Sequence, residues 1–212
     1  MIIHNEPVVQ AGKSLQEAKN VLIMVHGRGD SAQSFVHLAK ELDIPGDFAI
    51  IAIQAVGNTW YPYSFLAPVS QNEPQLTQSL DGLKEVYDNL MELDFVAENM
   101  FFLGFSQGAC LALEFCARHA KKYGGVIAFT GGLIGSEINA TDYRGEFENT
   151  PIFIGSSDVD PHVPLLRIEQ SETILKTMGG HVIKKIYPGM GHTINQDEIQ
   201  MANLILNKSL KK

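Results

Sequence analysis

Short apolar runs alternate with helical segments along most of the chain, and this alternation constrains the fold more than any other feature of the sequence. Two of the runs, Asn20–His26 (NVLIMVH) and Phe48–Ala55 (FAIIAIQA), are apolar at nearly every position and too short to cross a membrane. Strands that are apolar on both faces are typical of parallel sheets covered by helices on both sides. The sequence therefore predicts an α/β protein with a mostly parallel central sheet.

The same pattern continues to the end of the chain without a repeat, a low-complexity tract or a linker, so we expect residues 1–212 to form a single domain. A polar connection is expected over 131–150, and no large inserted cap domain is evident. The remaining predicted strands are Asn99–Phe105, Gly125–Thr130, Pro151–Gly155 and Val182–Tyr187, and the predicted helices are Ser31–Leu42, Leu76–Leu93, Gln107–Ala120, Leu165–Met178 and Asn195–Asn207.

The composition limits the kinds of binding partner and the cellular compartment that we expect for this chain. The formal charge of −8 argues against nucleic-acid binding, which usually requires a basic patch. The two cysteines, Cys110 and Cys116, fall on one predicted helix in different directions, so we expect them to be unpaired. Neither a signal peptide nor a membrane-spanning run is predicted, which favours a cytoplasmic protein with no integral membrane association. The sequence leaves open whether the chain forms a homodimer.

A nucleophile is predicted at Ser106, within Gly104-Phe105-Ser106-Gln107-Gly108. This G-x-S-x-G motif falls between an apolar strand and a helix, where a sharp turn presents the serine hydroxyl and glycines relieve backbone crowding. The motif alone often arises by chance in a glycine-rich turn. Its position makes it a moderately strong indication of nucleophilic catalysis, and it becomes strong once a base and an acid are found.

The predicted base is His192, in a glycine-rich loop between the last strand and the last helix. Of the other downstream histidines, His119 falls at the basic end of a helix, His181 opens a strand, and His162 is too close in sequence to the predicted acid. Both Asp158 and Asp160 follow a strand, and we favour Asp160 because Pro161 fixes its backbone. The second aspartate then supports the loop.

The loop His26-Gly27-Arg28-Gly29-Asp30 follows the first clear strand and is the candidate oxyanion loop. Acyl transfer needs two backbone N–H donors for the oxyanion, and we expect them from Arg28 and Gln107. The rival interpretation, a phosphate-binding loop, lacks the G-x-x-x-x-G-K-[ST] pattern. No zinc-type spacing of histidine or cysteine is present, so neither a metal nor an organic cofactor is expected.

A long irregular segment, Val56–Pro74, follows the second strand and is rich in aromatic residues. We predict that Trp60, Tyr61 and Phe65 line an apolar substrate pocket at the carboxyl end of the sheet. The alternative is that these side chains, Trp60 above all, anchor the segment on the core.

At HGRGD, GFSQG, DPHVP and GMGH the chain resembles the phospholipase/carboxylesterase family, which includes the acyl-protein thioesterases. The resemblance runs from about Val21 to the last helix, and the HGRG form is similar to a bacterial branch of the family. It implies an α/β-hydrolase fold and a triad of Ser106, Asp160 and His192. The eukaryotic thioesterases carry a different residue at the position of Arg28.

The sequence thus predicts a serine hydrolase that cleaves carboxylic ester or thioester bonds of a small-molecule or acyl ester substrate through an acyl-enzyme. Two alternatives stay open. One is a non-catalytic ligand-binding protein on a hydrolase scaffold, which should carry a broken triad. The other is a hydrolase of carbon–carbon or peptide bonds, which neither fold nor triad excludes.

Overall fold

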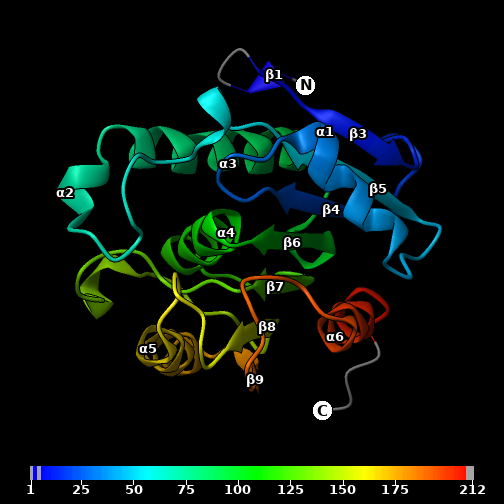
Figure 1. Ribbon diagram of the computed structural model, residues 1–212. Helices are drawn as coiled ribbons and strands as arrows, with labels where there is room; N and C mark the ends of the chain where they lie inside the picture. Colours follow the sequence, from blue (N-terminus) through cyan, green and yellow to red (C-terminus); the bar gives the residue numbers. More distant parts are fainter. Residues whose placement is uncertain (1, 4–5, 209–212) are drawn as a thin grey trace.

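The computed structural model describes residues 2–3 and 6–208, and most of its strands form one mostly parallel sheet (Figure 1). In the described part of the chain this sheet has seven strands in the order β3-β5-β4-β6-β7-β8-β9. Only β3 runs antiparallel, along β5; the other neighbours are parallel. The strands are β1 Ile2–Ile3, β2 Glu6–Pro7, β3 Val9–Gly12, β4 Asn20–Val25, β5 Phe48–Ile53, β6 Met100–Phe105, β7 Gly125–Phe129, β8 Pro151–Ser157 and β9 His181–Tyr187.

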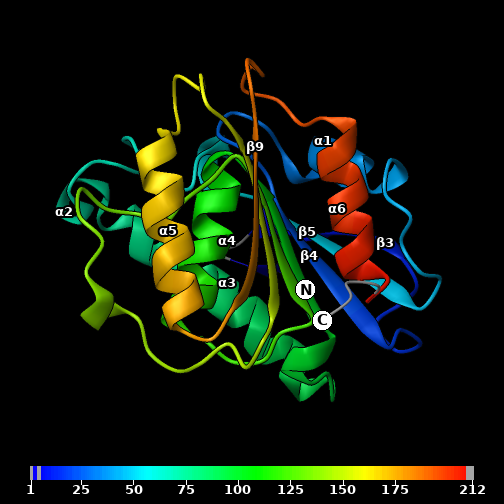
Figure 2. The ribbon, with the colours of Figure 1, turned by 90° about the horizontal axis from the view of Figure 1, so that it is seen from below.

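Helices cover both faces of the sheet, as Figure 2 shows along its edge. On one side α3, α4 and α5 pack on residues such as Val21 and Ile23, and on the other α1 and α6 pack on residues such as Leu22 and Met24. Successive residues of β4 thus enter opposite cores, which explains why its sequence is apolar throughout. The α-helices are α1 Ala32–Phe35, α2 Val69–Asn72, α3 Gln75–Glu92, α4 Gln107–Arg118, α5 Leu165–Thr177 and α6 Gln196–Leu206; short 3₁₀ helices span Val36–Lys40, Val56–Asn58, Ala97–Asn99 and Ala140–Asp142.

The predicted fold class is confirmed, and the six predicted strands correspond to β4 through β9. Two details differ. The helix expected over Ser31–Leu42 is a single α-turn followed by a 3₁₀ helix. The connection expected to be polar, residues 131–150, buries Leu133, Ile134 and Phe147 because it crosses the end of the core beside α4.

The parallel strands bring several distant loops to one end of the sheet. The loops after β8 and after β9 both lie at the upper edge of Figure 2, next to the start of α4. Ligand sites of open α/β sheets lie at this carboxyl edge. Within residues 2–3 and 6–208, no helix is long and apolar enough to cross a membrane.

Candidate active site

The turn between β6 and α4 holds Ser106 in a backbone conformation that residues with a side chain rarely adopt, with φ 54° and ψ −120°. The two flanking glycines are required by close contacts. A Cβ on Gly104 would lie 2.4 Å from the carbonyl oxygen of Gly108, and one on Gly108 would lie 2.1 Å from that of Val25. The start of α4 thus packs directly against the end of β4, and a side chain at either glycine would clash with the backbone. This steric constraint explains the G-x-S-x-G pattern.

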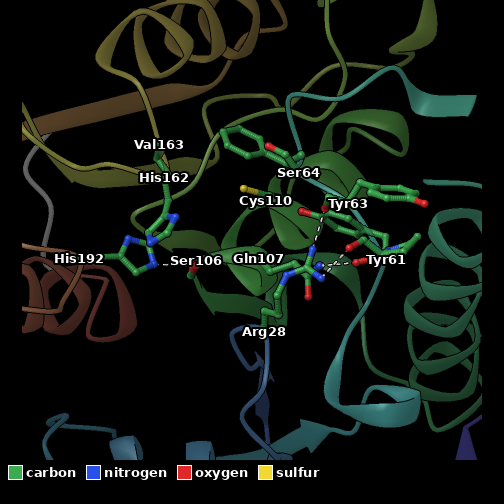
Figure 3. A pocket seen from close by; sticks show the side chains of 12 residues that line it. Arg28, Tyr61, Tyr63, Ser64, Ser106, Gln107, Cys110, His162, Val163 and His192 are labelled. Carbon is green, nitrogen blue, oxygen red and sulfur yellow. Dashed lines mark hydrogen bonds between the residues drawn. The ribbon is translucent and has the colours of Figure 1, made fainter. Parts of the chain in front are cut away.

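Three side chains from separate loops form one hydrogen-bonded chain, the first part of which Figure 3 shows. The Oγ of Ser106 lies 2.7 Å from Nε2 of His192, and Nδ1 of His192 lies 2.7 Å from Oδ2 of Asp160. A carboxylate only accepts hydrogen bonds, so Nδ1 donates to it and Nε2 is left to accept from the serine hydroxyl. The structure therefore brings together the predicted nucleophile, base and acid in the order that activation of a serine needs.

Asp160 is held in the ionised state by its surroundings. Burial works to raise the pKa of this carboxyl group, but hydrogen bonds from His192 and from the backbone N–H groups of His162 and Val163 outweigh it, so the pKa lies below its usual range. Asp158 lies elsewhere: its exposed side chain accepts a hydrogen bond from the Gly189 N–H at 2.8 Å. It thus ties the loop after β8 to the loop that carries His192.

The two predicted oxyanion donors belong to different loops: Gln107 directly follows Ser106, and Arg28 lies in the loop after β4. The first hydrogen bond within α4 is donated by the Cys110 N–H to the Ser106 carbonyl. The N–H of Gln107 precedes Cys110 in the chain, so it has no acceptor within the helix and is available to another group. The Arg28 N–H has no hydrogen-bond acceptor in the described part of the chain. Both residues line the cavity that contains Ser106.

This cavity has a volume of about 430 Å³, within the range of small-molecule sites. Tyr61 and Phe65, two of the three predicted pocket residues, are in its wall. The Gln107 side chain supports that wall: its Oε1 accepts from the Trp60 N–H and its Nε2 donates to the Tyr61 carbonyl. The cavity is lined by Arg28, Tyr61, Pro62, Tyr63, Ser64, Phe65, Ser106, Gln107, Cys110, His162, Val163 and His192.

Trp60, the third predicted pocket residue, is not among the residues that line this cavity. Its indole is 5% exposed, donates from Nε1 to the His26 carbonyl at 2.8 Å, and packs against the His26 ring. Tyr61, the next residue, belongs to the same buried core cluster but is also in the cavity wall. Trp60 therefore anchors the pocket segment.

We expect Trp60→Ala to lower the free energy of unfolding by roughly 3–5 kcal/mol, because it removes a large buried side chain. Hydrolysis of short and long acyl esters should fall by the same factor. Thermal denaturation and kcat/KM on graded esters measure both effects. Tyr63→Ala is the matched control, because Tyr63 is 58% exposed and lines the cavity; it should change the chain-length profile with little loss of stability. A stable Trp60→Ala variant with an altered profile would contradict the assignment.

His26 and His162, the other histidines near the site, have different environments. Nε2 of His26 accepts from the Ala55 N–H, Nδ1 contacts the Gly27 carbonyl, and burial lowers the pKa of its ring, so His26 is a neutral structural residue. His162 lines the cavity and packs edge-on against His192, with ring centroids 4.9 Å apart. The sequence excludes His162 as the base, and its position two residues after Asp160 agrees with its place in the pocket.

Cys110 and Cys116 are free and buried, as predicted. Burial raises the pKa of the Cys110 thiol to about 12, so this cavity-lining group is a neutral thiol rather than a nucleophile. Over the residues that the structure describes, no group of three His, Cys, Asp or Glu side chains is arranged to hold a metal ion.

Comparisons with known proteins agree with the fold and identify a family. The model of the phospholipase/carboxylesterase family matches residues 4–210. A phospholipase/carboxylesterase from Dyadobacter fermentans, known from a crystal structure, is 46% identical with a TM-score of 0.93, covering 98% of this chain and 99% of that chain. An acyl-protein thioesterase 1 from Debaryomyces hansenii is 28% identical, over 97% of this chain and 98% of the relative. SOBER1 of Arabidopsis thaliana, known from a crystal structure, has 20% identity and a TM-score of 0.75 and shares the fold. With the α/β fold and the serine at its strand-to-helix turn, these matches show that the chain belongs to the phospholipase/carboxylesterase family of hydrolases.

Proposed function

We propose that this chain, as one catalytic domain, hydrolyses carboxylic esters or thioesters through an acyl-enzyme on Ser106. The observation that carries the proposal is the hydrogen-bonded chain from Ser106 through His192 to Asp160, with both contacts at 2.7 Å. Such a chain activates a hydroxyl that is otherwise a weak nucleophile. The membership of a family of carboxylesterases and thioesterases supports the same class of substrate.

The reaction proceeds in two halves. Ser106 Oγ attacks the carbonyl carbon and its proton moves to His192 Nε2, while Asp160 stabilises the imidazolium. The N–H groups of Arg28 and Gln107 bind the oxyanion. The C–O or C–S bond then breaks and His192 gives its proton to the departing alcohol or thiol. A water molecule, deprotonated by His192, attacks the acyl carbon, and the acid leaves as Ser106 regains its proton.

Pre-steady-state kinetics with p-nitrophenyl esters of graded chain length test this proposal. We expect a burst of nitrophenolate close to one equivalent per chain, followed by slower turnover, because an acyl-enzyme accumulates. A serine-directed phosphonate should abolish turnover and label the peptide that contains Ser106, which mass spectrometry identifies. Absence of turnover on every ester and thioester, or turnover that survives complete labelling of Ser106, would contradict the proposal.

A further inference from the structure

The guanidinium of Arg28 is an unneutralised positive charge in the wall of the catalytic cavity. Its Nη1 donates to the Thr59 hydroxyl and the Pro62 carbonyl, and its Nη2 donates to the Tyr63 carbonyl. All three acceptors are neutral, and no carboxylate lies within 4 Å of Arg28 in the described part of the chain. These bonds hold the side chain in place without neutralising its charge.

Two N–H donors of the guanidinium are not used by the residues that the structure describes. It has five N–H groups in a planar fork, of which three are used in the bonds to the pocket segment. Neither Nε nor the second N–H of Nη2 has an acceptor among the residues that the structure describes. Hydrogen bonds between a guanidinium and a carboxylate are charge-assisted and about twice as strong as neutral ones. An anionic group of a ligand therefore fits this part of the wall better than an apolar one.

The position of Arg28 relative to the base decides which half of the substrate it contacts. Figure 3 shows His192 and His162 on one side of Ser106, and Arg28, Tyr61 and Tyr63 on the other. The leaving alcohol or thiol must receive its proton from His192 and so lies on the histidine side. The acyl chain then extends toward Arg28, along the wall formed by Tyr61 and Phe65.

We propose that the Arg28 side chain is a specificity determinant for acyl groups that end in a carboxylate, so that the preferred substrates are half-esters or half-thioesters of short dicarboxylic acids. This inference rests on the proposed function, since it assumes acyl transfer to Ser106. Arg28 then contributes twice: its backbone N–H binds the oxyanion next to the reacting carbon, and its side chain binds the far end of the same acyl group. Because both groups belong to one residue in the wall of a single cavity, a short acyl chain can span the distance between them.

The test compares monoethyl glutarate with the neutral primary amide of the same half-ester, which has nearly the same shape. With the unmodified protein we expect kcat/KM to favour the carboxylate by about 10- to 100-fold, mainly through KM, because the contact is remote from the reacting bond. Added salt should reduce this ratio by screening the charge pair. Free glutarate should inhibit competitively, and its neutral diamide should inhibit far less.

Substitutions then assign the preference to the side chain. Arg28→Gln should lower kcat/KM for both esters, because it loosens the segment that contains Thr59, but the carboxylate ester should lose at least about tenfold more. Thr59→Val is the matched control: it removes one acceptor of Arg28 and keeps the charge, so both esters should fall by the same factor and the ratio should stay.

Two results would overturn the inference. One is a ratio close to one in the unmodified protein, which needs no variant to fold. The other is an Arg28→Gln protein that keeps the full preference. In either case, continued hydrolysis of neutral esters with labelling of Ser106 leaves the proposed function standing, whereas loss of all ester turnover would remove both.

Discussion

Ser106→Ala is expected to lower kcat/KM for p-nitrophenyl esters by at least about a thousand-fold. The hydroxyl is the group that forms the acyl-enzyme, and after its loss only substrate binding and the two oxyanion N–H donors remain. The substitution deletes one oxygen from a residue whose own backbone is held by the Phe129 carbonyl, to which the Ser106 N–H donates.

The fold should survive this substitution, and circular dichroism and thermal denaturation provide the control. The variant should lose the nitrophenolate burst and resist labelling by a serine-directed phosphonate. A folded Ser106→Ala protein with near-normal turnover would show that the nucleophile is another group, and the mechanism proposed here would be wrong.

Asp160→Asn should lower kcat by about 10³–10⁴-fold, the second large effect. An asparagine at this position leaves the geometry nearly intact but offers an amide that can donate to Nδ1 of His192, which favours the wrong tautomer. It also leaves the imidazolium without a counter-charge. Because hydrogen bonds hold the pKa of Asp160 below its usual range, this counter-charge is present throughout the neutral pH range.

Asp158→Asn is the matched control, two residues away on the same loop. Its Oδ1 accepts from the Gly189 N–H, a bond that the oxygen of an asparagine amide can keep, so we expect less than about a tenfold loss of kcat. Steady-state kinetics on both folded variants give the ranking. A larger loss from Asp158→Asn than from Asp160→Asn would transfer the role of the acid to Asp158.

The strands could be predicted because a strand that is buried on both faces is apolar at nearly every position. The register of β4 between β5 and β6 buries all of its positions, and its sequence is apolar throughout. By contrast β3, Val9–Gly12, was missed. It is a four-residue edge strand whose positions alternate between half-buried and exposed, and its Ala and Gly residues have a low preference for strands. Its pairing with β5 depends on contacts between residues that are far apart in the sequence, which a local sequence pattern cannot predict.

The residues of the candidate site also divide into those that could be predicted from the sequence and those that could not. Ser106, Asp160 and His192 could be located because each follows a strand or precedes a helix in a parallel sheet, and topology brings such positions together. The direction of each aromatic side chain in the pocket segment could not be predicted. Trp60 and Tyr61 are neighbours in an irregular segment, where no period of two or of 3.6 fixes which residue faces the core. Sequence reasoning also limited Arg28 to its backbone N–H, because the acceptors of its side chain come from residues more than thirty positions away.

The close contact between Gly108 and the carbonyl oxygens of Val25 and His26 has a consequence for how such an enzyme can diversify. At this point the nucleophile turn and the oxyanion loop pack backbone against backbone, while most of the side chains in the cavity wall come from one separate segment, residues 61–65. Substitutions in that segment can therefore change the preferred acyl group without moving the nucleophile turn, whereas a single methyl group added at Gly108 would clash with the Val25 carbonyl, displace that turn and impair catalysis on every substrate at once.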